Sequence, residues 1–126
     1  MRHKFDPASL LTFIELDGFS SDWADLGLND DDLLRLQVAI MAHPKAGNVI
    51  KATGGLCKLR FSSIHLKRGK RGGFRVCYVY FEEYSIVLLV AAFSKSESAD
   101  LSPSEKKEFK KLIAEISMEL ESGPTN

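Results

Sequence analysis

The sequence predicts an α+β fold, in which a small antiparallel β-sheet packs against helices in the order β-α-β-β-β-α. Two helix start signals, near Asn29 and Ser102, flank the middle of the chain, and three β-prone segments follow one another between them. At 126 residues with 44% hydrophobic composition, the chain can build one core. We therefore expect residues 1–126 to form a single domain. We expect its core to contain Leu36, Ile40, Leu59, Phe61, Val76, Tyr78, Leu88, Val90, Leu112 and Ile116.

The first strand is predicted at residues 10–16, where a β-prone run ends at a turn-like Asp17-Gly18. A short helical or irregular segment over residues 20–25 carries Trp23, which we expect in the core. A helix then starts after Asn29, which can cap it, because the aspartates that follow favour the positive end of the helix dipole. It ends at His43, since a residue before proline is disfavoured in helices. Six apolar residues of this helix are predicted to form one broad buried stripe: Leu33, Leu34, Leu36, Val38, Ile40 and Met41.

The second half of the sequence is predicted to form three strands and a helix. Residues 56–62 alternate polar and apolar, with Lys58 and Arg60 on one face. Residues 74–81 form the next strand and place Arg75 on the face opposite Phe74. After a turn at residues 82–85, residues 86–93 are apolar on both faces, as in a buried central strand. The last helix starts at Ser102-Pro103-Ser104-Glu105, which supplies a capping serine and a proline at the first helical position.

The charges of this chain are strongly segregated although the formal net charge is zero. Residues 33–81 contain no Asp or Glu and ten basic residues, whereas both flanking segments are mainly acidic. A concentrated positive field favours a polyanionic partner, usually a nucleic acid. The alternative is a solvated lysine-rich surface, which is less favoured because ordinary surfaces mix their signs.

Several function classes have no support. The sequence lacks a nucleophile elbow, a phosphate-binding Walker loop and a zinc-protease motif. The two cysteines are not spaced as zinc ligands, so we expect neither a metal site nor a cofactor, and we expect reduced thiols. The longest apolar run, residues 86–93, is too short to span a membrane, and the N-terminus does not resemble a signal peptide. We therefore expect a cytoplasmic protein with no membrane contact.

The basic segment that precedes Phe74 has the composition of a phosphate-binding loop. In residues 67–73, glycines allow close approach of the backbone and four cationic side chains can contact phosphate oxygens. Arg75 follows in a strand, which can hold a guanidinium rigidly where negative charge develops on a phosphate. The alternative for Arg75 is an ion pair with Glu82, Glu83 or a carboxylate of the last helix.

Three segments of this chain resemble the RelE/HigB toxins, the toxic components of bacterial type II toxin–antitoxin systems. They are Thr-Gly-Gly-Leu-Cys-Lys-Leu-Arg at 53–60, Gly-Lys-Arg-Gly-Gly-Phe-Arg-Val-Cys-Tyr at 69–78 and Phe-Ser-Lys-Ser-Glu-Ser-Ala-Asp-Leu at 93–101. The resemblance covers about residues 33–115. The Gly-Gly-Leu-x-Lys-Leu-Arg block is most similar to the HigB-like branch.

This resemblance implies a RelE-like fold and a metal-independent endoribonuclease, an mRNA interferase that cleaves mRNA on the ribosome and inhibits translation. The reaction is attack of a ribose 2′-hydroxyl on the adjacent phosphate. The family's basic catalytic residues correspond to Arg75, Arg68, Lys70 and Lys95. We assign the remaining basic residues of the segment to RNA binding, with base stacking by an aromatic ring: Lys58, Arg60, Lys67, Arg71 and Phe93.

This chain departs from the family pattern after the last strand. Relatives often have Tyr-Gly-Lys-Asn-Glu where this sequence has Phe-Ser-Lys-Ser-Glu at 93–97. Phe93 can stack on a base but cannot transfer a proton. His65, in the basic loop, is a candidate replacement acid, although a solvated loop histidine is the favoured interpretation.

Two other functions remain open on the same fold: a non-catalytic ParE-like toxin that binds gyrase, and a plain RNA-binding module. The density of positive charge favours the nuclease over the gyrase binder. The resemblance also implies the ribosome, mRNA and a cognate helix-turn-helix antitoxin as partners. We place the antitoxin on residues 22–41, where Leu26 and Leu28 lie beside Asp30, Asp31 and Asp32. The alternative is that these residues only cap and pack the helix.

Overall fold

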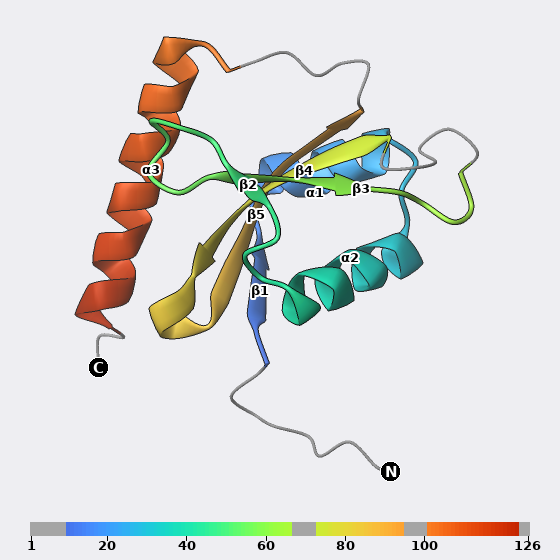
Figure 1. Ribbon diagram of the computed structural model, residues 1–126, viewed down its shortest axis with the longest axis horizontal. Coiled ribbons are helices and arrows are strands. Elements are labelled where there is room, and N and C mark those ends of the chain that lie inside the picture. The colour runs from blue at the N-terminus through green and yellow to red at the C-terminus, as the bar shows by residue number, and fades with distance from the viewer. Residues whose placement is uncertain (1–9, 67–72, 95–100, 124–126) are drawn as a thin grey trace.

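The computed structural model describes residues 10–66, 73–94 and 101–123 (Figure 1). Its elements are β1 (Thr12–Glu15), α1 (Asp17–Asp25), α2 (Asp30–Ala42), β2 (Asn48–Val49), β3 (Cys57–Phe61), β4 (Phe74–Phe81), the 3-10 turn η2 (Glu82–Tyr84), β5 (Ile86–Ser94) and α3 (Pro103–Ser122). The strands form one sheet in the order β1-β5-β4-β3-β2.

The α+β prediction is confirmed, with two changes in the sheet. The three central strands, β3, β4 and β5, are antiparallel as expected. The pairing of β1 with β5 is parallel, so the sheet is mixed rather than wholly antiparallel. The short edge strand β2 was not predicted, because two residues carry no periodic signal.

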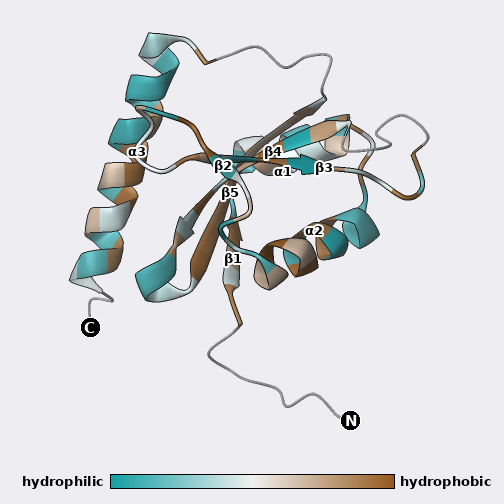
Figure 2. Cartoon of the chain, viewed as in Figure 1, coloured by the Kyte–Doolittle hydropathy of each residue, from teal (hydrophilic) through white to brown (hydrophobic). Residues whose placement is uncertain are grey.

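Helices cover both faces of the sheet (Figure 1). Helices α1 and α2 pack on one face through a core that includes Phe19, Trp23, Leu36 and Ile40. Helix α3 covers part of the other face, where Ile113 is buried against strand residues. In Figure 2, β5 is mostly brown whereas α3 alternates between brown and teal, as expected for a central strand and an amphipathic helix.

The predicted helix starts are confirmed at both capped helices. The Asn29 side chain accepts a hydrogen bond from the Asp32 amide at 2.9 Å, and Asp32 accepts one from the Asn29 amide. Ser102 and Glu105 form the same reciprocal capping box at the start of α3. Helix α1 instead starts at Asp17 without a side-chain cap, so the turn expected at Asp17-Gly18 is wrong.

The buried stripe predicted for α2 is too broad. Leu36 and Ile40 are buried, but Leu34 and Val38 are 58% and 52% exposed. Neither α1 nor the sheet extends over that side of the helix. In the rest of the predicted core, three residues are only partly buried: Leu59, Leu112 and Ile116.

A β-bulge determines which residues of β5 share a face. Cys77 pairs with Ala91 and Tyr78 pairs with Leu89, so Val90 is an extra residue in β5. The two cysteines are free and buried, and they belong to the cores on opposite faces of the sheet. Cys57 and Cys77 therefore cannot form a disulfide with each other.

Candidate nucleic-acid interface

Three of the predicted site residues form a row across the three central strands. Arg60 of β3 pairs in register with Arg75 of β4, and Arg75 pairs with Phe93 of β5. Residues directly opposed in an antiparallel sheet have Cα atoms about 4.5–5.5 Å apart, with side chains on the same face. We call Arg60, Arg75 and Phe93 the arginine row. Lys58 lies on the same face, two residues from Arg60 along β3 and opposite Cys77.

The strand holds Arg75 firmly. Its neighbours Phe74 and Val76 are buried on the opposite face, at 1% and 0% exposure, and fix the local backbone. The Arg75 side chain is half-buried, and its Nη1 donates a hydrogen bond to the Phe74 carbonyl oxygen at 3.2 Å. Phe93 is half-buried and packs against the core beneath α3. The arginine row is therefore anchored in the sheet but open to solvent on one side.

Like charges directly opposed in a sheet oppose folding, so the Arg60–Arg75 pairing calls for an explanation. Glu82 lies seven residues from Arg75, about 23 Å along β4, and it pairs with Lys45 at 2.9 Å. The alternative in which Arg75 pairs with Glu82 or Glu83 is therefore wrong. Within the described residues, no carboxylate lies within ion-pair distance of Lys58 or Arg60. This face of the sheet carries cations that suit an external anion.

The other predicted site residues, Lys67, Arg68, Lys70, Arg71 and Lys95, lie outside the described residues. The pairing of the strands nevertheless shows where the segments that contain these residues join the sheet. Phe74, which starts β4, pairs with both Phe61 and Ser94. The segments 62–73 and 95–101 therefore connect to the sheet at the same end, next to the arginine row.

His65 is exposed, as expected of a loop histidine, and its ring contacts side chains on the other side of the sheet. Its Nδ1 lies 3.0 Å from Ser63 Oγ and 3.1 Å from Asp32 Oδ2. Ser63 Oγ also donates to Asp32 Oδ1 at 2.9 Å. Asp32 belongs to the capping box of α2, so this cluster ties the start of the 62–73 segment to that helix. The candidate role of His65 as a general acid therefore finds no support. Nothing in the sequence signals the cluster, because Ser63 and Asp32 are 31 residues apart.

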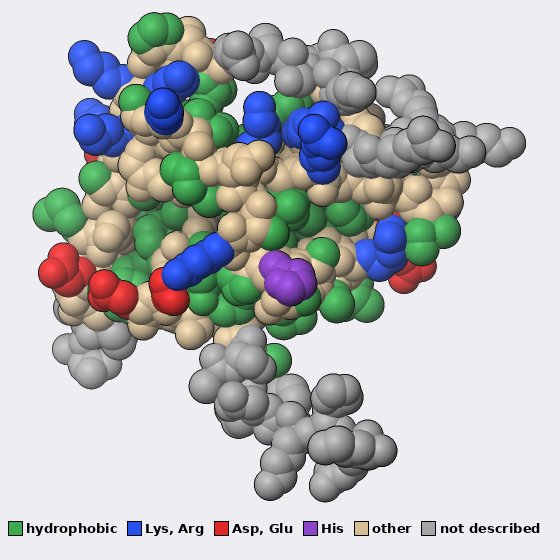
Figure 3. All heavy atoms as spheres, in the orientation of Figure 1, with side chains coloured by type: hydrophobic (Ala, Val, Ile, Leu, Met, Phe, Trp, Pro, Cys, Tyr) green, Lys and Arg blue, Asp and Glu red, His purple; other side chains and the backbone are tan. Residues whose placement is uncertain are grey.

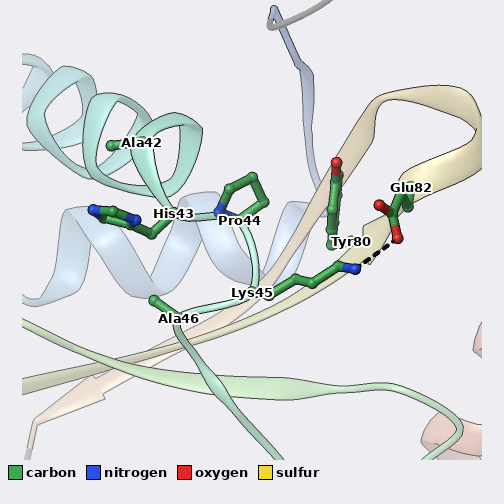
Figure 4. A pocket seen from close by; sticks show the side chains of 7 residues that line it. All are labelled: Ala42, His43, Pro44, Lys45, Ala46, Tyr80 and Glu82. Carbon is green, nitrogen blue, oxygen red and sulfur yellow. Dashed lines mark ion pairs between the residues drawn. The ribbon is translucent and has the colours of Figure 1, made fainter.

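A separate pocket of about 510 Å³ lies at the far end of β4 (Figure 4). It is bordered by the residues after α2 and by Tyr80 and Glu82, and the Lys45–Glu82 ion pair crosses it. The hydrogen bond to Glu82 raises the pKa of the exposed Lys45 ammonium. His43 is exposed and points away from Glu82 (Figure 4). No predicted site residue borders this pocket.

Charge is segregated on the surface as well as in the sequence. In Figure 3, most Lys and Arg side chains of the displayed face lie over the first half of α3 and the central strands. Most of the visible Asp and Glu side chains lie along the lower left margin.

In the part of the chain that the structure describes, no helix is long and apolar enough to cross a membrane. Over the same residues, no three His, Cys, Asp or Glu side chains are grouped as metal ligands.

A model of the family described as the RelE toxin of the RelE/RelB toxin–antitoxin system matches residues 24–122. The chain belongs to the RelE toxin family. The match runs from the end of α1 to the end of α3 and so includes the whole arginine row. The RelE/HigB resemblance is thereby confirmed at the level of the family, and the HigB-like branch stays a prediction.

The fold is similar to that of a solved RelE structure. A mutant of the Escherichia coli toxin RelE in the free state matches with a TM-score of 0.51 and 14% sequence identity, over 71% of this chain and 87% of that chain. At this identity the likeness shows the fold alone. A crystal structure of the isolated E. coli RelE toxin matches with a TM-score of 0.48 and 14% identity, over 81% of this chain and 98% of that one.

Proposed function

We propose that this RelE-family toxin is a metal-independent endoribonuclease that cleaves mRNA on the ribosome, in the cytoplasm. The observation that supports this proposal best is the arginine row, in which two guanidiniums stand beside an aromatic ring on one face of the sheet. Guanidiniums bind phosphate oxygens through paired hydrogen bonds, and an aromatic ring stacks on a base of any identity. The row therefore suits one nucleotide together with the phosphate beside it.

The proposed reaction uses the RNA's own hydroxyl as nucleophile. The ribose 2′-oxygen attacks the adjacent phosphorus and forms a new P–O bond. The bond from phosphorus to the 5′-oxygen of the next nucleotide breaks, and that oxygen takes up a proton. The products are a 2′,3′-cyclic phosphate and a free 5′-hydroxyl. The 2′-hydroxyl proton passes to a base at the site or to water, so no oxidant or metal is needed.

Arg75 is assigned to the phosphate whose negative charge increases in the transition state. A positioned cation contributes most when it is held rigidly beforehand, and Arg75 lies in a strand between two buried residues. We assign Arg68, Lys70 and Lys95 to the same charge stabilisation. Phe93 is assigned to base stacking.

The remaining basic residues are assigned to binding rather than to chemistry. Lys58 and Arg60 lie on one face of β3. In this proposal the reacting phosphate binds on that face of the sheet. Lys67 and Arg71 belong to the adjoining basic segment of the sequence. Each phosphate contact that these residues make contributes to a salt-dependent affinity.

Membership of this family implies an antitoxin partner. We propose that the partner carries a helix-turn-helix domain and docks within residues 22–41. The patch predicted there needs correction, because Leu28 and Asp32 are buried at 6% and 2% exposure. The large exposed hydrophobic residues of this region are Leu34 and Val38, one turn apart on the same side of α2. Hydrogen-exchange protection of Leu34 and Val38 in the complex tests the placement, and protection confined to the arginine row contradicts it.

The proposed activity is tested by inducing the protein in cells and mapping new mRNA 5′ ends against the reading frame. We expect growth arrest with cleavage inside translated regions and a bias relative to the codon frame. The same cells are assayed for DNA breaks. Arrest with broken DNA and intact mRNA would support the gyrase-binding alternative. RNA binding without growth arrest or mRNA cleavage would support the alternative that the protein is a plain RNA-binding module.

A further inference from the structure

We infer that the first half of α3 and the turn between β2 and β3 form a second phosphate-binding surface, which holds the RNA backbone outside the cleaved nucleotide. The inference rests on the proposed function, because it extends the same RNA path. The surface is a groove of about 830 Å³. Its lining includes four lysines of α3 and Ala52 of the turn. We call it the lysine groove, defined by Ala52, Lys106, Lys107, Lys110 and Lys111.

The turn that borders this groove opposite α3 is held by hydrogen bonds within it. Thr53 is fully buried; its hydroxyl donates to the Ile50 carbonyl at 2.6 Å and accepts from the Leu56 amide at 3.1 Å. Ala52 has a positive φ of 66°, which is uncommon for a residue with a side chain and marks a conformation imposed by its surroundings. The turn is therefore held in one conformation.

The turn also sits directly on α3. At Gly54, with φ of 79°, an added Cβ would lie 3.4 Å from the Lys110 side chain. The glycine thus allows both the left-handed backbone and the close approach to the helix. The Thr-Gly-Gly sequence that starts the first resemblance block directly follows Ala52, the residue of the turn that lines the groove.

The first half of α3 is rich in lysine. A helix favours acidic residues near its N-terminus and basic residues near its C-terminus. Glu105 in the first turn follows this preference, whereas the last turn contains no basic residue. The four lysines and Glu108 follow Glu105 in the first half, and Glu115, Glu119 and Glu121 occupy the second half. The lysines give the groove a net positive charge that suits an external anion.

The lysine groove and the arginine row lie on the same face of the sheet. Helix α3 packs on the face that carries Cys77 and Phe93, which is the face of Arg60 and Arg75. Lys58 lies between the two sites, since β3 runs from the groove's turn towards Arg60. In Figure 3 the basic side chains over α3 and over the central strands face the same side of the molecule. A polynucleotide bound at the row can continue over Lys58 into the groove.

The chemistry of the groove favours RNA over a protein partner. Its lining contains no aromatic or large aliphatic side chain, whereas protein interfaces are enriched in aromatic residues and depleted in lysine. Glu108 is the one carboxylate among the lining residues. Glu105 is engaged at the helix start, where it accepts a hydrogen bond from the Ser102 amide at 2.9 Å. Compact ammonium groups around a groove suit successive phosphates.

The test measures binding of the full chain to fluorescent 2′-O-methyl RNA, which cannot be cleaved, as salt is varied. The variant K106Q/K107Q/K110Q/K111Q is compared with the wild type on a 20-nucleotide and a 4-nucleotide RNA. Loss of two to four phosphate contacts should lower the salt slope for the long RNA by about 1.4–2.8. We expect at least about tenfold weaker binding of the long RNA and unchanged binding of the short one.

Two control variants separate a local site from net charge. K106R/K107R/K110R/K111R keeps the charge and should bind as the wild type does. R35E/K45E changes net charge by the same four units on other surfaces, and both residues are exposed. An equal loss in R35E/K45E, or an unchanged slope in the glutamine variant, would overturn the inference. So would loss of binding to a polyglutamate peptide without loss of RNA binding.

The outcome is distinguishable from failure of the proposed function. If Arg75→Ala still cleaves mRNA while the glutamine variant binds long RNA weakly, the catalytic proposal fails and the lysine groove stands. If the glutamine variant binds long RNA normally while Arg75→Ala abolishes cleavage, the lysine groove fails and the catalytic proposal stands. Circular dichroism on each variant confirms that the fold is retained.

Discussion

Arg60 stands directly opposite Arg75 on neighbouring antiparallel strands, with both side chains on the same face of the sheet. Such a pairing of like charges costs stability, about 0.2–1 kcal/mol relative to a neutral pair. Its position beside Phe93 suits the proposed ligand, because an RNA phosphate placed between the two guanidiniums would reduce their repulsion.

The first prediction separates stability from function at this pair. Arg60→Gln should raise the free energy of unfolding by about 0.2–1 kcal/mol and weaken RNA binding. Urea unfolding at low and high salt measures the gain, which should shrink at high salt because screening already reduces the repulsion. Lys45→Gln removes an exposed ion pair instead and should give no gain. A less stable Arg60→Gln protein would show that the pair is not repulsive.

The second prediction concerns the buried carboxylate of Asp32. It caps α2 and accepts a hydrogen bond from Ser63, so Asp32→Ala should lower the free energy of unfolding by about 1–3 kcal/mol. Asp31→Ala, an exposed change in the same helical turn, should cost less than about 0.5 kcal/mol. Thermal and urea unfolding of both variants give the comparison. Equal effects would mean that the cluster with Ser63 contributes nothing.

The third prediction concerns the Tyr78 hydroxyl, which joins β4 to the segment after α2. It donates to the Pro44 carbonyl at 2.9 Å and accepts from the Gly47 amide at 3.0 Å. Tyr78→Phe leaves both groups without this partner and should cost about 1–3 kcal/mol of stability. Tyr84→Phe, at an exposed site, serves as the control and should be near neutral. Urea unfolding distinguishes the two.

The fourth prediction concerns the Cys77 thiol and pH. Burial raises the pKa of Cys77 from 9.0 to about 11. The folded state therefore holds the thiol proton more tightly than the unfolded state does. The stabilisation from this group is complete below pH 9 and is lost as pH rises from about 9 to 11. Cys77→Ala should flatten that part of the stability–pH curve. Alkylation at pH 8 should also be slow until the protein unfolds, and rapid labelling of native Cys77 would contradict the burial.

The sequence predicted those parts of the fold that depend on local chemistry. Asn29 and Ser102 marked both capped helices because capping uses residues within one turn. The alternation around Arg75 gave its face correctly because strand periodicity is local. The predicted burial of Leu34 and Val38 was wrong for the opposite reason, since their exposure depends on which elements pack against α2.

Register was beyond prediction for the same physical reason. The pairing of Arg60 with Arg75 depends on how β3 and β4 align across a long connection, and no short turn sets that alignment. The parallel pairing of β1 and the extra residue Val90 are likewise set by tertiary packing. The sequence could therefore predict which face of its own strand carries Lys58, Arg60 or Arg75, but not the arginine row.

The most direct test of the central claim measures cleavage by purified protein of mRNA bound to programmed ribosomes, comparing Arg75→Ala with the wild type. Arg35→Ala is the matched control, because Arg35 is an exposed arginine on α2 whose Nη1 donates to the Ser62 carbonyl. We predict that Arg75→Ala lowers the single-turnover cleavage rate at least about a hundredfold, as removal of one charge-stabilising group does. Arg35→Ala should cleave at the wild-type rate. Full cleavage by a folded Arg75→Ala protein would contradict the account.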